Sequence, residues 1–222
     1  MMKVKRLKTE TKTETGDARK KPRSFEDTHE RILEKALELF SKKGFRGSTT
    51  KELAAGAEVS EVTLYRHFES KEAIFEEIAR RFTIIPVLQN IPPEILAKPL
   101  GDKLKYIAER FFKIFRERTS MMRMMFSEAI INKEQAKMLL ENLPMKALAI
   151  ISKLFEREIA EGKVKKLDPK IIARLFLGTL LSYNLFQEIL YGKEYESFDE
   201  GVVIETLVET YLKGIEVEAK KK

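Results

Sequence analysis

Side chains suited to catalysis or metal binding are sparse in this chain of 222 residues, which has two histidines and no cysteine. Glu26-x-x-His29 has the spacing of one half of a carboxylate-bridged di-iron site, but such a site needs a second copy. The residue three before the other histidine, His67, is Leu64, so the second copy is missing. Zinc sites, Gly-rich phosphate loops and local Ser/His/Asp signatures are likewise unsupported. We therefore expect two unrelated histidines, no enzyme and no cofactor.

Residues 48–72 indicate a different kind of site, because two short helical patterns meet there at a tight turn and a third helix follows at once. Thr49-x-x-Glu52 has the form of a capping box, in which a hydroxyl and a carboxylate each take a free amide. Ser60 and Ser70 are suited to capping the second and third helices. Two short helices at a tight turn are typical of a helix-turn-helix, whose second helix enters the DNA major groove.

The segment 40–75 also resembles the DNA-reading head of the TetR family of transcriptional regulators. The ordered positions that carry the resemblance are Gly44-Phe45, Thr49-Thr50, Leu53-Ala54, Val59-Ser60, Leu64-Tyr65-Arg66-His67-Phe68 and Ser70-Lys71-Glu72. One position departs from the family pattern, because Glu58 stands where the family usually has glycine. A glutamate at a turn site that favours positive φ costs about 1 kcal/mol, unless Gly56 absorbs the bend or the turn has another shape.

The resemblance implies DNA contacts for ten residues of the head. Val62 and Thr63 would face base edges, where a methyl group packs on a thymine methyl. Glu61 would accept from a cytosine amine or only cap its own helix. Phosphate contacts fix register without reading sequence, and the positions that match them, unless they are ordinary solvated surface, are Thr50, Tyr65, His67 and Lys71. The full predicted set is Thr49, Thr50, Ser60, Glu61, Val62, Thr63, Tyr65, Arg66, His67 and Lys71.

Positive charge is concentrated at the two ends of the chain. The formal net charge is +7, residues 1–24 hold nine basic and three acidic side chains, and the last three residues are lysines. The basic arm is either a solvated tail or a segment that contacts DNA phosphates or the minor groove. In the second case it would lie beside the reading helix, which is the second helix of the helix-turn-helix. Both interpretations stay open.

Helical periodicity continues through the rest of the chain, and neither β-alternation nor a repeat of useful length occurs. We expect helices over about 27–43, 71–86, 102–117, 168–192 and 199–215, and over 133–162 either two helices or a single one. The predicted fold is all-α, with about nine helices. Its parts are a flexible basic arm (1–24), a three-helix helix-turn-helix DNA-binding domain (25–72), a C-terminal helical bundle for ligand binding and dimerisation (73–218) and a basic tail (219–222).

The aromatic and methionine residues of the segment 111–126 have two interpretations. At helical spacing they usually form core, but methionine adapts its shape and also lines pockets for apolar ligands. TetR-family proteins hold inducers in the C-terminal helical domain, so the resemblance favours a pocket for a small apolar effector. The candidate lining residues are Phe82, Ile107, Phe111, Met122, Met125, Phe126, Phe176 and Tyr183.

The last two expected helices are apolar on more than one side. Gly178 and Ser182 are small residues four apart, which lets a second helix approach closely. The family pairs its last two long helices with those of a partner, so the resemblance implies a homodimer through a four-helix bundle. The alternative is two more internal core helices.

Together these features predict a homodimeric, ligand-responsive regulator that binds double-stranded DNA. The favoured form is a repressor, released from a palindromic operator by a small apolar ligand. No apolar run approaches the ~20 residues that span a membrane, and no secretory signal is visible, so we expect a cytoplasmic protein without a membrane partner. The alternatives are a helical small-molecule carrier or enzyme without sequence-specific DNA binding, and a non-specific DNA-coating protein driven by the basic arms.

Overall fold

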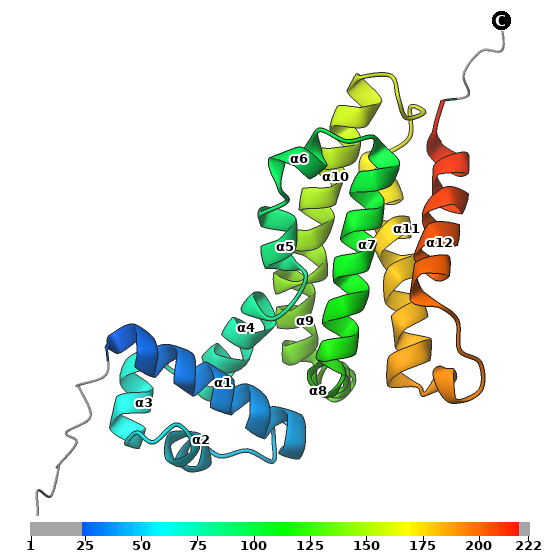
Figure 1. Ribbon diagram of the computed structural model, residues 1–222. Coiled ribbons are helices and arrows are strands. Elements are labelled where there is room, and N and C mark those ends of the chain that lie inside the picture. The colour runs from blue at the N-terminus through cyan, green and yellow to red at the C-terminus, as the bar shows by residue number, and fades with distance from the viewer. Residues whose placement is uncertain (1–23, 218–222) are drawn as a thin grey trace, which may run out of the picture.

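The computed structural model describes residues 24–217, which fold into a small helical head and a larger helical body (Figure 1). Within this range the regular structure is helical, apart from an isolated antiparallel bridge between Val164 and Glu216. The all-α prediction is therefore confirmed. The predictions for the basic tail and for the arm, except Ser24, lie outside the described residues.

Four helices build the head and its connection to the body: α1 (Phe25–Lys43), α2 (Thr50–Gly56), α3 (Glu61–His67) and α4 (Lys71–Arg81). Each begins where a Ser or Thr side chain accepts a hydrogen bond from a backbone amide, which satisfies one of the free donors of a helix start. The helix α1 begins two residues before the expected Asp27, because Ser24 and Asp27 form a capping box. Ser24 therefore belongs to the head rather than to the arm.

The body contains α5 (Ile85–Gln89), α6 (Pro93–Leu96), α7 (Leu100–Glu117), α8 (Thr119–Ile131), α9 (Lys133–Asn142), α10 (Pro144–Ala160), α11 (Pro169–Asn184) and α12 (Glu200–Ile215). A π-helical segment (Leu185–Ile189) and a 3₁₀ turn (Gly192–Glu194) follow α11. The last helix has the expected bounds. Sequence patterns missed the short helices α5 and α6, and they indicated only a short segment where α8 forms a full helix.

Two helix ends differ from the expectation by more than two residues, and the choice left open for residues 133–162 is settled at a proline. The helix α4 stops at Arg81 instead of about Pro86, because the chain turns before Pro86 enters the first turn of α5. The segment 133–162 forms two helices, since Leu143 before Pro144 leaves the helical region (φ −116°, ψ −80°). The expected helix 168–192 ends as an α-helix at Asn184 and continues as the π-helical segment.

The body is arranged so that one end meets the head and one edge is left uncovered. The helix α8 packs against α1, and α9 packs against α4. The helices α11 and α12 both pack on α7 and lie along the edge far from the head (Figure 1). No helix between residues 24 and 217 is long and apolar enough to cross a membrane.

Candidate nucleic-acid interface and apolar cavity

The turn between α2 and α3 has the shape that glycine usually provides, although Glu58 occupies it. Glu58 has a φ of +52°, whereas Gly56 is not among the residues with positive φ. The turn is held from α1, because Arg31 donates its Nε hydrogen to the carbonyl oxygen of Ala57 at 2.6 Å. A side chain at positive φ is strained, so Gly56 does not absorb the bend and the head carries this cost at Glu58.

The helix α3 is anchored on one side and exposed on the other. Leu64 is fully buried and Phe68, at its C-terminal end, nearly so, and both belong to the core of the head. The opposite face presents Val62, which is 81% exposed, together with the exposed Tyr65 and Arg66. An apolar side chain exposed this strongly on a short helix next to a guanidinium suits contact with base edges and phosphates.

A surface depression lies between the start of α2 and the start of α4. It is lined by Arg46, Ser48, Thr49, Thr50, Tyr65, Glu69, Ser70, Lys71 and Glu72. Backbone amides and hydroxyl groups at helix starts favour anions, while the two carboxylates oppose them. Four of the ten predicted DNA contacts line the depression: Thr49, Thr50, Tyr65 and Lys71. The hydroxyl of Thr50 also donates to the carboxylate of Glu61 at 3.3 Å.

Lys71 has a structural role in the head that the sequence did not predict. Its Nζ donates to the carbonyl oxygens of Phe45 and Ser48, both at 2.9 Å. The ammonium also lies 4.3 Å from the centre of the Phe45 ring. Two of its three donors thus hold the loop between α1 and α2, and contact of Lys71 with a phosphate stays a prediction.

His67 packs against α1 and is only partly exposed. Its ring stacks on Phe25 at 3.9 Å, and both ring nitrogens are buried without a hydrogen-bond partner among the described residues. Burial lowers the pKa of His67, and the charges of His29 and Arg66 lower it further, so the ring is neutral near pH 7. The side chain of His67 is therefore only partly exposed, and its contact with a phosphate stays a prediction.

The two histidines are neighbours, so the expectation that they are unrelated is wrong. The rings of His29 and His67 lie 5.7 Å apart and join α1 to α3. His29 also stacks on Phe68 at 4.3 Å. Residues 24–217 contain no group of three or more His, Cys, Asp or Glu that could hold a metal ion. The two histidines therefore belong to an aromatic cluster at the N-terminal end of α1.

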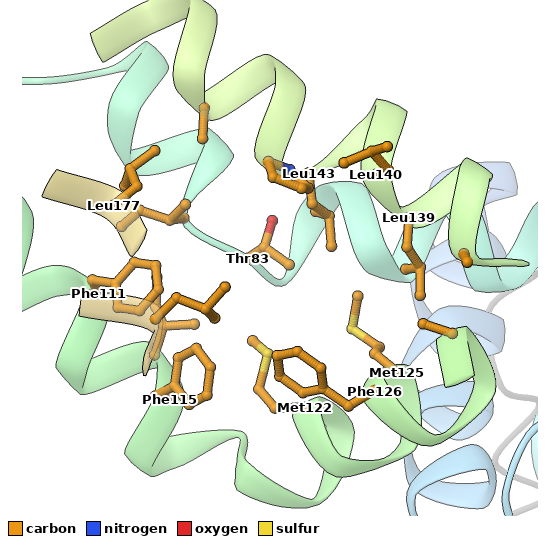
Figure 2. A pocket seen from close by; sticks show the side chains of 17 residues that line it. Thr83, Phe111, Phe115, Met122, Met125, Phe126, Leu139, Leu140, Leu143 and Leu177 are labelled. Atoms are coloured by element: carbon orange, nitrogen blue, oxygen red, sulfur yellow. The ribbon is translucent and has the colours of Figure 1, made fainter. Parts of the chain in front are cut away.

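The body contains a cavity of about 310 Å³ between α7, α8, α9, α10 and α11 (Figure 2). Its wall exposes almost no polar surface, which suits an apolar guest. The lining residues are Thr83, Ile84, Phe111, Ile114, Phe115, Met122, Met125, Phe126, Ala129, Ala136, Leu139, Leu140, Leu143, Pro144, Ala147, Leu177 and Leu181.

Half of the predicted ligand contacts line this cavity: Phe111, Met122, Met125 and Phe126. The other four do not. Ile107 and Phe176 are fully buried in the core. Phe82 lies under the guanidinium of Arg118 at 4.5 Å, and Tyr183 stacks on Phe112 at 5.4 Å.

Sequence reasoning missed the wall that α9 and α10 contribute, from Ala136 to Ala147. The sequence signal that could have indicated this wall is Pro144, which separates two apolar helices. Side chains of both helices then line the same space. It also missed Thr83, which stands between α4 and α5.

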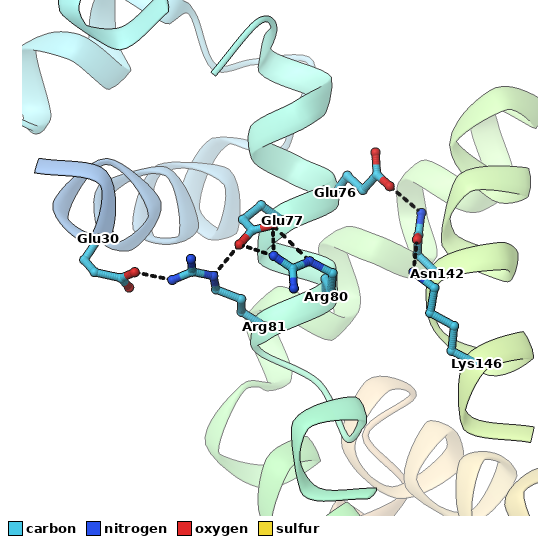
Figure 3. Close-up of polar contacts among 7 residues, drawn as sticks. All are labelled: Glu30, Glu76, Glu77, Arg80, Arg81, Asn142 and Lys146. Carbon is cyan, nitrogen blue, oxygen red and sulfur yellow. Dashed lines mark hydrogen bonds and ion pairs between the residues drawn. The ribbon is translucent and has the colours of Figure 1, made fainter. Parts of the chain in front are cut away.

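Polar contacts connect the head to the helices that line the cavity. Asn142 of α9 donates its side-chain amide to Glu76 of α4 at 2.8 Å, and its amide oxygen accepts from Lys146 at 2.6 Å (Figure 3). On the other side, Arg46 lies 3.7 Å from the buried carboxylate of Glu128 on α8. Movement of α8 or α9 would therefore change contacts that position the head.

Ion pairs hold α4 to α1 within the head. Arg81 of α4 bonds to Glu30 of α1 and to Glu77 on its own helix (Figure 3). Burial alone would raise the pKa of Glu77, but hydrogen bonds from Arg80 and Arg81 outweigh it and leave that pKa lowered. The Glu77 carboxylate therefore stays charged and holds Arg81, which joins α4 to α1 through its ion pair with Glu30.

Comparison with protein-family models gives two matches that together cover most of the described chain. Residues 32–78 match the family described as bacterial regulatory proteins, tetR family. Residues 102–214 match the family described as the C-terminal domain of AefR-like transcriptional repressors. The second match alone covers more than half of the chain.

Curated relatives match over part of the chain. YerO of Bacillus subtilis, an uncharacterized HTH-type transcriptional regulator, is 31% identical over 108 residues, or 48% of this chain and 37% of YerO. IcaR of Staphylococcus aureus, a negative transcriptional regulator of a biofilm operon, is 38% identical over 48 residues, or 22% of this chain and 26% of IcaR. The matched parts thus span about a third or less of these relatives.

Solved structures match over most of the fold. A Clostridium perfringens putative fatty acid metabolism regulator has a TM-score of 0.66 and 25% identity, covering 85% of this chain and 100% of its own. FadR of Bacillus subtilis, solved in complex with stearoyl-CoA, has a TM-score of 0.66 and 18% identity, covering 84% and 98%. An identity of 18% supports the fold alone.

Proposed function

Because this chain belongs to the TetR family of transcriptional regulators, we propose that it is a homodimeric repressor that a small apolar ligand releases from a palindromic operator. The observation that carries the proposal is the path of α4. This helix begins in the DNA-reading head, at Lys71, and ends at Arg81, two residues before Thr83 and Ile84 in the wall of the apolar cavity. A guest in the cavity would thus act on the chain segment that holds the reading helix.

The DNA contacts follow from the exposed face of α3. Val62 reads bases by apolar contact, and Arg66 supplies charge to the backbone or to a base edge. Tyr65, Thr49 and Thr50 position the head on a phosphate at the depression beside α2. His67 is left out of this set, because its ring is stacked under Phe25.

The homodimer rests on a stripe of exposed small and apolar side chains along α11 and its continuation: Ile171, Leu175, Gly178, Ser182 and Phe186. The spacing of three and four residues puts them on one face. A Cβ atom added to Gly178 would meet nothing within 4 Å in the described chain. Further exposed apolar residues flank the stripe: Leu190, Tyr191, Tyr195, Phe198 and Val202. A contiguous apolar surface of this kind supports pairing with a second copy.

Release of DNA would follow from the contacts between body and head. A ligand can shift the equilibrium between two states only by its difference in affinity for them. A guest that separates α8 from α9 strains the Arg46–Glu128 and Glu76–Asn142 contacts in the DNA-bound arrangement. The two reading helices then lose the spacing of one helical turn, about 34–36 Å, that successive major grooves demand.

Selection from a pool of random duplex DNA at about physiological salt tests the proposal. Enrichment of a palindrome with two half-sites is the expected result. No enrichment by the full chain would contradict sequence-specific regulation and favour the carrier or enzyme alternative. Binding that ignores sequence, falls steeply with salt and disappears without residues 1–23 would favour the DNA-coating alternative.

A further inference from the structure

Thr83 is the feature of the cavity that apolar packing does not explain. It is 7% exposed, and its hydroxyl has no hydrogen-bond partner among the described residues. Of the side chains that line the cavity in the described chain, Thr83 alone carries a polar group. Figure 2 shows it in the wall across from Met122 and Phe126. A buried hydroxyl without a partner costs about 1–3 kcal/mol, so a valine or alanine would suit a purely apolar core better.

The surroundings of Thr83 indicate what could pair with its hydroxyl. A water molecule needs two to four polar partners to stay in such a place, and this wall offers a single hydroxyl. A guest molecule that fills the apolar space and carries one polar atom satisfies both requirements. Rotation about the Cα–Cβ bond of Thr83 to another staggered position turns either its methyl group or its hydroxyl toward the cavity. The hydroxyl can then donate or accept a hydrogen bond.

Charge and size narrow the class of guest further. The lining contains no Lys, Arg or His among the described residues, so a carboxylate would be buried without a counter-ion, at a high cost. Arg118 stacks on Phe82, which precedes Thr83 in the chain, and it lies outside the lining. A volume of about 310 Å³ lies at the small end of the range for small-molecule pockets, about 300–1,000 Å³.

We propose that the cavity recognises an uncharged, compact apolar molecule with a single hydrogen-bonding group, and that Thr83 is the residue that recognises this group. The inference rests on the proposed function, because it specifies the ligand of the same regulator. It predicts that a fatty acid whose carboxylate is buried in this cavity binds more weakly than the corresponding alcohol. Thr83 follows α4 by two residues, so the ligand would hold the chain where the head joins the body.

Calorimetric titration of the full-length protein without DNA tests the inference with two matched sets of probes. One set is naphthalene, 1-naphthol and 1-naphthoate, and the other is 1-octanol and octanoate. The alcohols are expected to bind, naphthalene several-fold more weakly than 1-naphthol, and both carboxylates at least about tenfold more weakly than their alcohols. Thr83→Val should weaken both alcohols by about three- to tenfold and leave naphthalene unchanged, while Thr83→Ser should retain the preference for alcohols.

Thr28→Val is the matched control, because Thr28 is 8% exposed and lies in the head, where its hydroxyl donates to the carbonyl of Ser24. It should leave all five affinities unchanged. Tighter binding of octanoate than of 1-octanol would make Arg118 the recognising group and overturn the inference. Equal weakening of naphthalene and 1-naphthol by Thr83→Val would reduce Thr83 to a packing role, and failure of all five probes to bind would exclude this ligand class. Because DNA is absent, none of these outcomes depends on whether an operator exists.

Discussion

In the head, all four helices begin at a side chain that accepts a backbone hydrogen bond, whereas α5, α6, α7, α8 and α10 of the body begin without one. The head also has aromatic contacts within a short stretch of chain, such as Phe40 with Phe45 at 5.3 Å. The body relies on long apolar faces, and those faces leave both a cavity and an uncovered edge. Local hydrogen bonding thus defines a rigid reading unit, while looser apolar packing leaves room for a ligand and a partner.

The largest expected effect is the loss of the proposed dimer when the uncovered edge of the body is altered. Gly178→Gln places a side chain in the middle of the α11 stripe, where nothing within the described chain obstructs it. The monomer should fold normally, because Gln is a better helix former than Gly, but close approach of a second α11 is blocked. The dimer dissociation constant should rise by about a hundredfold or more, as measured by analytical ultracentrifugation, since a clash of this kind costs several kcal/mol.

Gly214→Gln provides the control for this substitution. Gly214 is also an exposed glycine of a body helix whose added Cβ atom would meet nothing within 4 Å, and it lies at the C-terminal end of α12. It should weaken the dimer much less than Gly178→Gln, because Gly214 lies at the end of α12 whereas Gly178 lies in the middle of the α11 stripe. A dimer that persists in Gly178→Gln and dissociates in Gly214→Gln would move the interface away from the α11 stripe.

The second prediction separates two roles on the exposed face of α3. Val62→Ser should weaken binding to the selected operator by about tenfold and relax the preference at one base position, with the salt dependence unchanged. Arg66→Ala should reduce the slope of log affinity against log salt by about one if its guanidinium contacts phosphate. Titrations at several salt concentrations decide between these roles. Equal loss of affinity for every sequence in Val62→Ser would exclude base reading by Val62.

The same contrast explains how much the sequence could predict. Capping residues act within three positions of one another, so Thr49, Ser60 and Ser70 identified the starts of α2, α3 and α4 directly. The cavity depends on the distance between helices that are remote in sequence, and Phe176 and Met122 carry the same apolar signal. The structure places Phe176 in the core and Met122 in the wall, which periodicity alone cannot distinguish.

Side-chain contacts between helices were hidden for a similar reason. Lys71 and His67 have the residue types that contact phosphates, yet both have partners within the head. Those partners, Phe45 and Phe25, lie more than twenty residues earlier in the chain. Only the packing of α1 against α3 and α4 brings them into reach.

The third prediction concerns Lys71, where the rigid head and the DNA surface coincide. Lys71→Met removes two charge-assisted hydrogen bonds to the loop between α1 and α2. Because the side chain is partly exposed, we expect a loss of about 1–2 kcal/mol in the opening free energy of the head. Native-state hydrogen exchange of the α2 amides measures this loss. If the salt slope of operator binding also falls by about one, Lys71 contacts phosphate as well.

The fourth prediction concerns backbone strain at Glu58, in the turn between α2 and α3. Glu58→Gly should give a free energy of opening about 1 kcal/mol higher than Glu58→Ala, because glycine adopts a φ of +52° without the steric cost of a side chain. Glu58→Ala is the matched reference, since both substitutions remove the glutamate side chain and only alanine keeps the Cβ atom. Equal stabilisation by both substitutions would locate the effect in the glutamate side chain rather than in the backbone.

The smallest effect is expected from the histidine pair. In an unfolded chain the pKa of His67 lies near 6.5, and in the folded head burial, helped by the charges of His29 and Arg66, lowers it. Between the folded pKa and about 6.5 the unfolded chain binds more protons than the folded one. The opening free energy of α3 should therefore rise with pH through this window and fall as the pH drops.

Hydrogen-exchange protection of α3, corrected for the intrinsic exchange rate at each pH, measures this dependence. His67→Phe keeps a ring to stack on Phe25 and removes the titrating group, so protection should become independent of pH in this window. His29→Phe removes one neighbouring charge and should reduce the dependence without abolishing it. An unchanged pH dependence in His67→Phe would assign the effect to another group and would leave the aromatic stack as the only role of His67 in joining α1 to α3.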